Sequence, residues 1–202
     1  MAILNPSFED PLVGPGGICN CSPTDWTTTG IVGVWDPGPP GPGNSFFDTI
    51  PDGNQIMFVA FTGTGGEATQ TLTATLQADT TYTLSYWVGA RKDMPFNPYT
   101  VSLIANSNVL ASDSGGLPAP GDFVQRTFSF SSGSNPADLG AALTIDITAP
   151  PEFGGQAEFD LIQLDATPTR GSSEAPEPAS MLLAGAGLIA GFVSIRRRRH
   201  SK

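Results

Sequence analysis

The sequence has one histidine and little positive charge before its C-terminal end. His200 is the single histidine among 202 residues, and only four of the nine Lys and Arg residues precede residue 175. Without histidine, general acid–base chemistry in this part of the chain would fall to carboxylates. Eighteen of the 19 acidic residues also precede residue 175, giving that part a net charge of −14. Such a surface repels phosphate backbones, so we expect no nucleic acid partner.

Familiar catalytic motifs are also missing. The chain contains no Gly-x-Ser-x-Gly elbow, and the glycines of residues 62–66 are not followed by the lysine of a phosphate-binding loop. A glycosidase needs two carboxylates about 5 to 10 Å apart, and no spacing among the acidic residues singles out a pair. We therefore predict that the chain is not an enzyme, with a carboxylate-based glycoside hydrolase as the least favoured alternative.

Cysteine is scarce, and its two copies are nearly adjacent, at Cys19 and Cys21. Two thiolates do not supply the four ligands of a structural zinc site. Outside the cytoplasm the pair can oxidise, although so short a ring stabilises the fold little. We expect a local disulfide in a loop.

No part of residues 1–166 shows a sustained helical period. Short runs that alternate between apolar and polar residues are separated by Gly, Pro, Asn and Asp, which is typical of an all-β sandwich or jelly roll. Residues 82–88 show the clearest alternation, with a period of two. We predict one domain over residues 1–166 and a linker over residues 167–175. About nine strands are expected, at residues 4–9, 31–35, 56–61, 70–76, 82–88, 100–104, 125–131, 143–148 and 158–164.

The only long apolar run lies at the C-terminal end. Residues 179–195 carry no charge and are followed by four consecutive arginines. A helix of this length would be roughly 25 Å long, at the short end for a bilayer core of about 30 Å. Its few polar residues show no helical period, which argues against a core helix. We predict a single transmembrane helix with a cytoplasmic C-terminus, because basic residues beside a membrane segment stay inside.

The three parts of this end occur in a recognisable order. The Pro-Glu-Pro triplet, the helix over residues 179–195 and the basic tail over residues 196–202 resemble the PEP-CTERM sorting signal of Gram-negative bacteria. The resemblance implies an exosortase as processing partner and a precursor anchored in the inner membrane, which then reaches the cell surface or an exopolysaccharide matrix. Residues 1–6 have no signal character, so we expect an export signal to be missing from the sequence. The expected sorting residues are Pro176, Glu177, Pro178, Arg196, Arg197, Arg198 and Arg199.

The rest of the chain resembles the carbohydrate-binding modules of the galactose-binding-like jelly-roll superfamily. The matching pieces are residues 5–9, Trp26, residues 70–72, residues 81–88 and residues 159–164. The resemblance implies a jelly roll with a structural calcium ion held by Glu9 and Asp160. Calcium prefers oxygen ligands, and a cation would offset the repulsion between two neighbouring carboxylates.

A sugar site needs aromatic platforms and a few hydrogen-bonding side chains. Residues 89–99 follow the clearest strand and hold two of the four bases, so we expect Trp35, Arg91, Asn97 and Tyr99 to form such a site. The alternative for the aromatic residues is packing inside the fold. The predicted function is a non-catalytic, exported module that binds neutral polysaccharide. The alternative is a structural surface or matrix protein without specific sugar binding.

Overall fold

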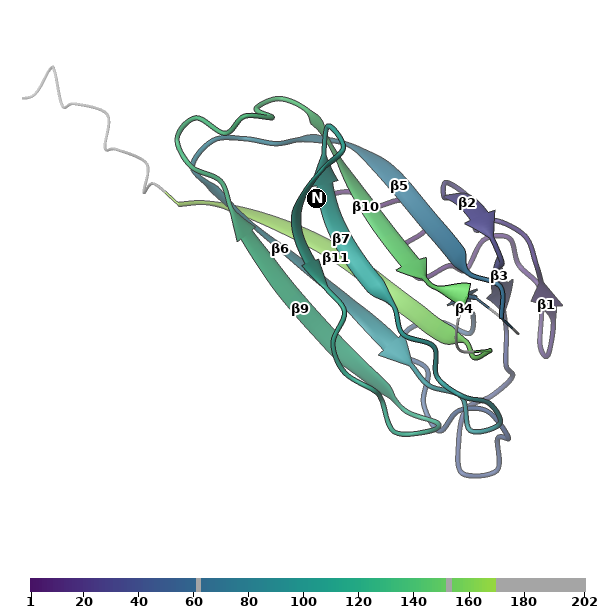
Figure 1. Cartoon of the computed structure of the whole chain (residues 1–202). Helices are drawn as coiled ribbons and strands as arrows, with labels where there is room; N and C mark the ends of the chain where they lie inside the picture. Colours follow the sequence, from purple (N-terminus) through teal and green to yellow (C-terminus); the bar gives the residue numbers. More distant parts are fainter. Residues whose placement is uncertain (61–62, 152–153, 170–202) are drawn as a thin grey trace, which may run out of the picture. The chain divides into compact units, whose positions relative to one another are not determined.

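The computed structural model describes residues 1–60, 63–151 and 154–169, which form an all-β sandwich of two antiparallel sheets (Figure 1). The six-stranded sheet has the spatial order β1 (Ile18–Cys19), β3 (Val32–Trp35), β4 (Ile56–Val59), β11 (Ala157–Pro168), β6 (Thr80–Gly89) and β9 (Phe123–Ser131). The five-stranded sheet has the order β2 (Thr27–Gly30), β5 (Gly66–Thr75), β10 (Ala142–Ala149), β7 (Thr100–Ala105) and β8 (Asn108–Asp113).

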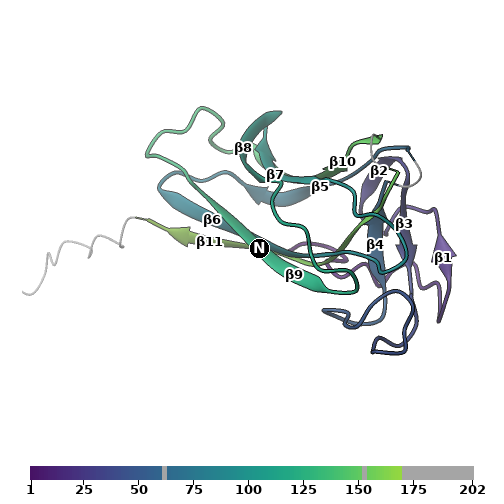
Figure 2. The same ribbon diagram turned by 60° about the horizontal axis from the view of Figure 1, so that its bottom comes forward.

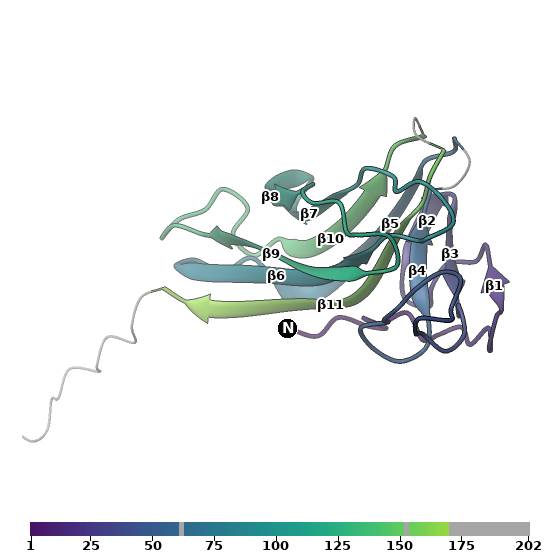
Figure 3. The same ribbon diagram turned by 90° about the horizontal axis from the view of Figure 1, so that it is seen from below.

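The main core lies between the two sheets, which form separate layers (Figure 2, Figure 3). In β6 the alternation predicted from the sequence is confirmed, because every second residue of the strand is buried. Tyr82, Leu84, Tyr86 and Val88 all point inward. Strands β5 and β10 likewise bury one face and present threonines on the other.

The predicted fold class is confirmed as a two-sheet sandwich, but the described residues contain 11 strands rather than about nine. Strands β1, β2 and β8 were not predicted. Strand β8 follows β7 through a tight turn in which Asn106 and Ser107 have φ angles of 48° and 68°. A short polar turn of this kind does not by itself predict a hairpin when the residues after it do not alternate clearly between apolar and polar.

The strand predicted over residues 4–9 is wrong. Asn5 and Phe8 have φ angles of 46° and 57°, which are incompatible with an extended strand. Phe8 nevertheless enters the core, because its side chain is fully buried against Trp26 with ring centroids 5.4 Å apart.

The described residues belong to one compact unit, Met1–Thr169. Strand β11 continues to Pro168, two residues into the expected linker. The predicted membrane helix over residues 179–195 and the sorting residues lie outside the described residues. Within the described part of the chain, no helix has the length and hydrophobicity needed to cross a membrane.

Candidate functional site

The outer face of the six-stranded sheet, away from the main core, carries a second apolar cluster. Residues 36–55, which connect β3 to β4, fold over this face (Figure 3). They are tied to the β6–β7 connection, since Lys92 forms an ion pair of 2.7 Å with Asp48 and its backbone N–H donates to the Phe46 carbonyl. The cluster consists of Trp35, Phe47, Ile56, Phe58 and Phe123, with Ile31, Phe46, Ile50 and Trp87 packed against it. The part of the sheet face under this cluster is therefore dry, whereas the outward threonine and serine pairs of β6 and β9 remain exposed.

One row of residues crosses five strands on this face. Its members are paired strand to strand in the order Gly33, Phe58, Glu158, Gly89 and Phe123. Paired residues on adjacent strands point to the same side of a sheet. A Cβ atom on Gly33 would collide with the Phe58 ring, and one on Gly89 would collide with the Phe123 ring. The two glycines thus make room for two aromatic rings, and the row places an acid between them.

Glu158 is the unusual member of this row. Its side chain is fully buried, and neither carboxyl oxygen has a hydrogen-bond partner among the described residues. Burial raises the pKa of Glu158 well above its usual range, and the positive charge of Arg91 offsets only part of this rise. Such surroundings favour the protonated form of the carboxyl, which is the form that can donate a proton.

Arg91 is fixed in place beside this acid. Its Nε and Nη2 atoms donate to the two carboxylate oxygens of Asp93 at 2.8 and 2.7 Å, and its Nη1 atom donates to Gln156 Oε1 at 2.8 Å. Its guanidinium carbon lies 4.4 Å from the centroid of the Trp35 ring. Hydrogen bonds from Arg91 hold the pKa of Asp93 below its usual range. The pair therefore adds no net charge to the site.

A pocket of about 340 Å³ opens beside these residues. It is lined by Ile18, Asn20, Phe58, Arg91, Met94 and Gln156. Glu158 adjoins two of these wall residues, since Phe58 is its cross-strand partner and Gln156 lies two positions before it. The volume is in the range of small-molecule sites. The chain thus provides a largely apolar cavity with three polar side chains, and the raised-pKa carboxyl of Glu158 is the strand partner of one of its wall residues.

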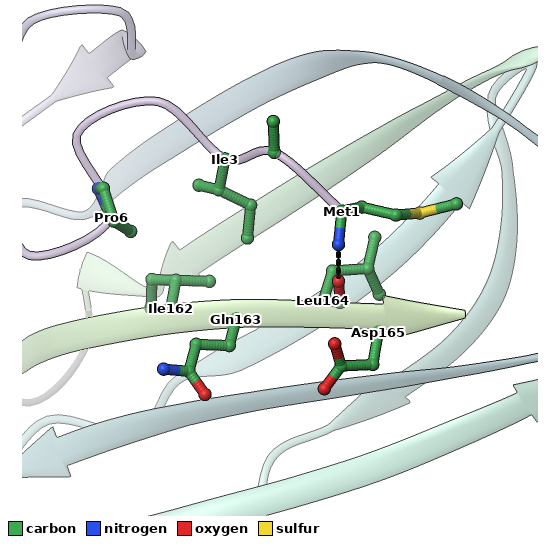
Figure 4. Close-up of a pocket in the computed structure, with 8 residues that line it drawn as sticks. Met1, Ile3, Pro6, Ile162, Gln163, Leu164 and Asp165 are labelled. Carbon is green, nitrogen blue, oxygen red and sulfur yellow. Dashed lines mark hydrogen bonds between the residues drawn. The ribbon is translucent and has the colours of Figure 1, made fainter. Parts of the chain in front are cut away.

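A larger pocket, of about 420 Å³, lies between the first residues and β11 (Figure 4). There the N-terminal amino group of Met1 donates to the Leu164 carbonyl. Its polar side chains, Gln163 and Asp165, are exposed to solvent. Because none of its ionisable side chains is buried away from water, this pocket is the weaker candidate for the functional site.

The structure brings together two of the four predicted ligand-binding residues. Trp35 and Arg91 stack on the outer face, as described above. Tyr99 is buried, and its hydroxyl donates to the Gly115 carbonyl at 2.6 Å. Asn97 is also buried and donates to the Pro150 carbonyl at 2.8 Å. Tyr99 borders a different pocket, of about 330 Å³, which we name the Tyr99 pocket; its walls are Phe96, Pro98, Tyr99, Ser114, Gly116 and Leu117.

The two predicted calcium ligands lie near each other but hold backbone groups. Glu9 Oε1 accepts hydrogen bonds from the N–H groups of residues 54 and 55, both at 2.8 Å. Asp160 accepts from the N–H groups of Asp52 and Leu161 at 2.9 and 2.7 Å. Burial raises the pKa of Asp160 to about 8, and the negative charges of Asp52 and Glu9 add to the rise. Within residues 1–60, 63–151 and 154–169, no group of three His, Cys, Asp or Glu side chains has the geometry of a metal site.

The chain has two family matches. Residues 1–165 match the HpiC1-like model, described as HpiC1 cyclase, and residues 174–199 match the PEP-CTERM protein-sorting motif. No curated protein sequence matches the chain.

Solved cyclase structures are similar over most of the chain. A cyclase from Fischerella sp. TAU is 26% identical with a TM-score of 0.74, covering 85% of this chain and 98% of that one. The Stig cyclase Fisc from the same source, in complex with (3Z)-3-(1-methyl-2-pyrrolidinylidene)-3H-indole, is 25% identical with a TM-score of 0.74, covering 84% and 98%. The module TmCBM61, in complex with β-1,4-galactotriose, is 14% identical with a TM-score of 0.52, covering 82% and 97%. At that identity only the fold is shared.

These comparisons confirm the sorting-signal prediction, and the motif implies export and surface sorting through an exosortase. They also confirm the likeness of the body to carbohydrate-binding jelly rolls, as a matter of fold. The prediction that the chain is not an enzyme is wrong, because its body matches a cyclase family and cyclase structures. The physical reason is that the sequence argument looked only for a histidine or for a spaced pair of carboxylates. The missing histidine excluded imidazole chemistry, but a buried carboxyl can supply the acid instead.

Proposed function

Because the chain belongs to the HpiC1-like cyclase family, we propose that it closes a ring on an unsaturated, indole-bearing substrate, with Glu158 as the proton donor. The observation that carries this proposal is the buried carboxyl of Glu158, whose two oxygens have no partner among the described residues. The indole unit is suggested by the ligand in the related cyclase Fisc. A pocket of about 340 Å³ with mainly apolar walls suits a molecule of this kind.

The proposed chemistry is an acid-catalysed isomerisation. The O–H bond of Glu158 breaks as its proton forms a C–H bond with an alkene carbon of the substrate. This leaves a carbocation and a Glu158 carboxylate. The electron-rich aromatic ring attacks the cation and forms the new carbon–carbon bond. The ring then returns a proton to the carboxylate, so the product has the formula of the substrate and the acid is restored.

The surroundings of Glu158 support this role. Residues 36–55 cover the part of the sheet face around Phe58, and a dry site favours the protonated acid. Aromatic ring faces such as that of Phe58 stabilise a nearby cation. Arg91 would oppose a cation if it were unpaired, but Asp93 balances its charge through two hydrogen bonds.

The decisive variant is Glu158→Gln in the full chain, which keeps the shape of the side chain and removes its proton. Turnover of indole-bearing alkenes, followed as the appearance of an isomer of unchanged mass, should fall by about 10²-fold or more. Binding of an indole probe should persist. Asp146→Asn is the matched control, because Asp146 also has an unpartnered buried oxygen but lies on the outer face of the five-stranded sheet. Its turnover should equal that of the unaltered chain.

Two results would contradict the proposal. Full turnover by Glu158→Gln would show that the proton comes from another group. Failure of the unaltered chain both to bind indole probes and to convert any indole-bearing alkene would remove the cyclase assignment for this pocket.

A second candidate function is binding of a neutral glycan in the Tyr99 pocket. The specific observation is Asn97, which stands between two wall residues and has a buried Oδ1 atom without a partner among the described residues. The pocket walls carry no charge and include two aromatic rings, as neutral sugar sites do. Titration with neutral oligosaccharides tests this. Binding that Phe96→Ala abolishes and Glu158→Gln leaves intact would support it, and no binding by the unaltered chain would refute it.

A further inference from the structure

The disulfide between Cys19 and Cys21 adjoins, along the chain, two residues that line the pocket beside Glu158. Ile18 and Asn20 are two of the six wall residues, and they flank Cys19 on either side. Asn20 is also the single residue enclosed by the disulfide ring. The position of this part of the wall therefore depends on the conformation of residues 18–21.

The backbone alone holds this segment weakly. Strand β1 has two residues and lies at the edge of the six-stranded sheet, where it pairs only with β3 (Figure 1, Figure 2). The pairing consists of Ile18 with Trp35 and Cys19 with Val34. Before it, the chain turns through Gly14 and Gly16, whose φ angles of 75° and 74° favour glycine. So short an edge pairing frays easily unless a further link orders it.

A continuous set of contacts leads from the disulfide to the acid. The carbonyl oxygen of Cys19 packs so closely on Gly33 that a Cβ atom there would collide with it. The same Cβ atom would collide with the Phe58 ring, and Phe58 is the cross-strand partner of Glu158. Movement of residues 18–21 would therefore reach both the pocket wall and the ring beside the acid.

We propose that the Cys19–Cys21 disulfide is a redox clamp, which completes the substrate pocket only after the chain has left the reducing cytoplasm. The sorting motif implies export, and disulfides persist in oxidising compartments. The inference rests on the proposed function for the identity of the ligand. To close the clamp, the two thiols of Cys19 and Cys21 exchange with an external disulfide, which takes up their two electrons and two protons and becomes a dithiol. In the reverse reaction a dithiol supplies two electrons and two protons, the Cys19–Cys21 bond breaks to give two thiols, and the dithiol closes its own disulfide.

The clamp should act locally. A bridge that encloses one residue restricts the unfolded chain little, so its reduction should leave the sandwich folded. The loss should appear in the affinity of the pocket for its ligand and not in the melting temperature.

The test compares the oxidised full chain with the same protein reduced by dithiothreitol. The probe is 4-(1H-indol-3-yl)butan-2-one, an indole ketone found in a Fischerella cyclase structure, and its affinity is measured by calorimetry. Reduction should weaken binding by about tenfold, as expected when an apolar wall contact is lost. The double variant Cys19→Ser, Cys21→Ser should match the reduced protein and no longer respond to dithiothreitol. Equal affinity in both redox states overturns the proposal.

A second readout separates this proposal from the proposed function. The Asp36 N–H donates to the Gly17 carbonyl at 2.9 Å, so its hydrogen exchange reports whether β1 stays in place. Faster exchange after reduction supports the clamp even if the oxidised chain binds no indole ketone, an outcome that would count only against the proposed indole ligand. Unchanged exchange refutes the clamp even if the chain is a cyclase. If the double variant does not fold, the comparison of the oxidised and reduced forms of the unaltered protein remains the test.

Discussion

At the scale of single residues, burial raises the pKa of three carboxyl groups, and their surroundings give them different roles. Glu158 has no partner among the described residues and adjoins a pocket. Asp160 is held by two backbone N–H groups near other carboxylates. Asp146 lies on the outer face of the five-stranded sheet, where the charge of Glu67 adds to the effect of burial. Of the three, Glu158 is the one placed for chemistry.

Asp146→Asn should stabilise the protein at neutral pH and not in acid. Burial raises the pKa of Asp146 to about 6 in the folded chain, whereas an unfolded aspartate has a pKa of about 3.9. The folded state therefore binds more protons between these values, so stability is lost as the pH rises through this window. Asparagine has no ionisable carboxyl group, so the Asp146→Asn protein does not lose this stability as the pH rises. Because the side chain is partly exposed, we expect a gain of about 1 kcal/mol, or roughly 2–4 °C in melting temperature.

Thermal unfolding of both proteins at about pH 4 and about pH 8 checks this expectation. The gain should appear only at the higher pH. An equal gain at both values would mean that the substitution acts through packing or through the unfolded chain, and not through the charge of Asp146.

We propose that Glu9 and Asp160 bind calcium when it is supplied. A cation favours the ionised carboxylates, so it should lower the pKa of Asp160 and raise the melting temperature. Calcium at about a millimolar is the test, with magnesium at the same concentration and a chelator as controls. The stabilisation should grow as the pH rises toward about 8, where Asp160 loses its proton without help. It should vanish in Asp160→Asn. Equal melting temperatures in calcium and chelator would contradict the proposal.

At the scale of strands, local alternation predicted the strands that bury one face. Residues 82–88 and 143–148 lie within β6 and β10, and their alternate residues enter the main core. The same rule did not reveal the candidate site. An acid at every second position of residues 158–160 indicates a face turned to water, and only the packing of residues 36–55 makes that face dry. No local pattern reports where a Pro- and Gly-rich connection will pack. Trp35 and Arg91 were identified from residue type, but not their neighbour Glu158.

Gly33→Ala should destabilise the six-stranded sheet. The added Cβ atom would meet the Cys19 carbonyl, a backbone atom, and the ring of Phe58. Neither can move without disturbing β1 or the second apolar cluster, so we expect a loss of about 1–3 kcal/mol in the free energy of unfolding. Urea denaturation measures it. Gly133→Ala is the control, because no atom lies within 4 Å of its Cβ position. Equal stability of Gly33→Ala and the unaltered chain would show that these contacts are looser than described.

At the scale of the whole chain, the two family matches cover separate segments, one matching a cyclase family and one matching a sorting signal. The cyclase match ends at residue 165, inside β11, and the sorting match begins at residue 174. The sequence alone predicted the sorting signal, because the Pro-Glu-Pro triplet, the apolar run and the basic tail occur in a fixed order with distinctive composition. It did not predict the cyclase family, because the proposed acid, Glu158, is buried only through long-range packing.

This division has a consequence for the processed protein. Cleavage near the Pro-Glu-Pro triplet would leave residues 1–165 complete, so the released form should keep its disulfide, its pocket and its turnover. The intact mass of the protein recovered from the cell surface and from the medium should correspond to a C-terminus near Pro176–Pro178. The same fractions should convert the substrate at the rate of the full chain. A surface form that still ends at Lys202 would contradict processing, and a cleaved form without turnover would show that the C-terminal residues contribute to the site.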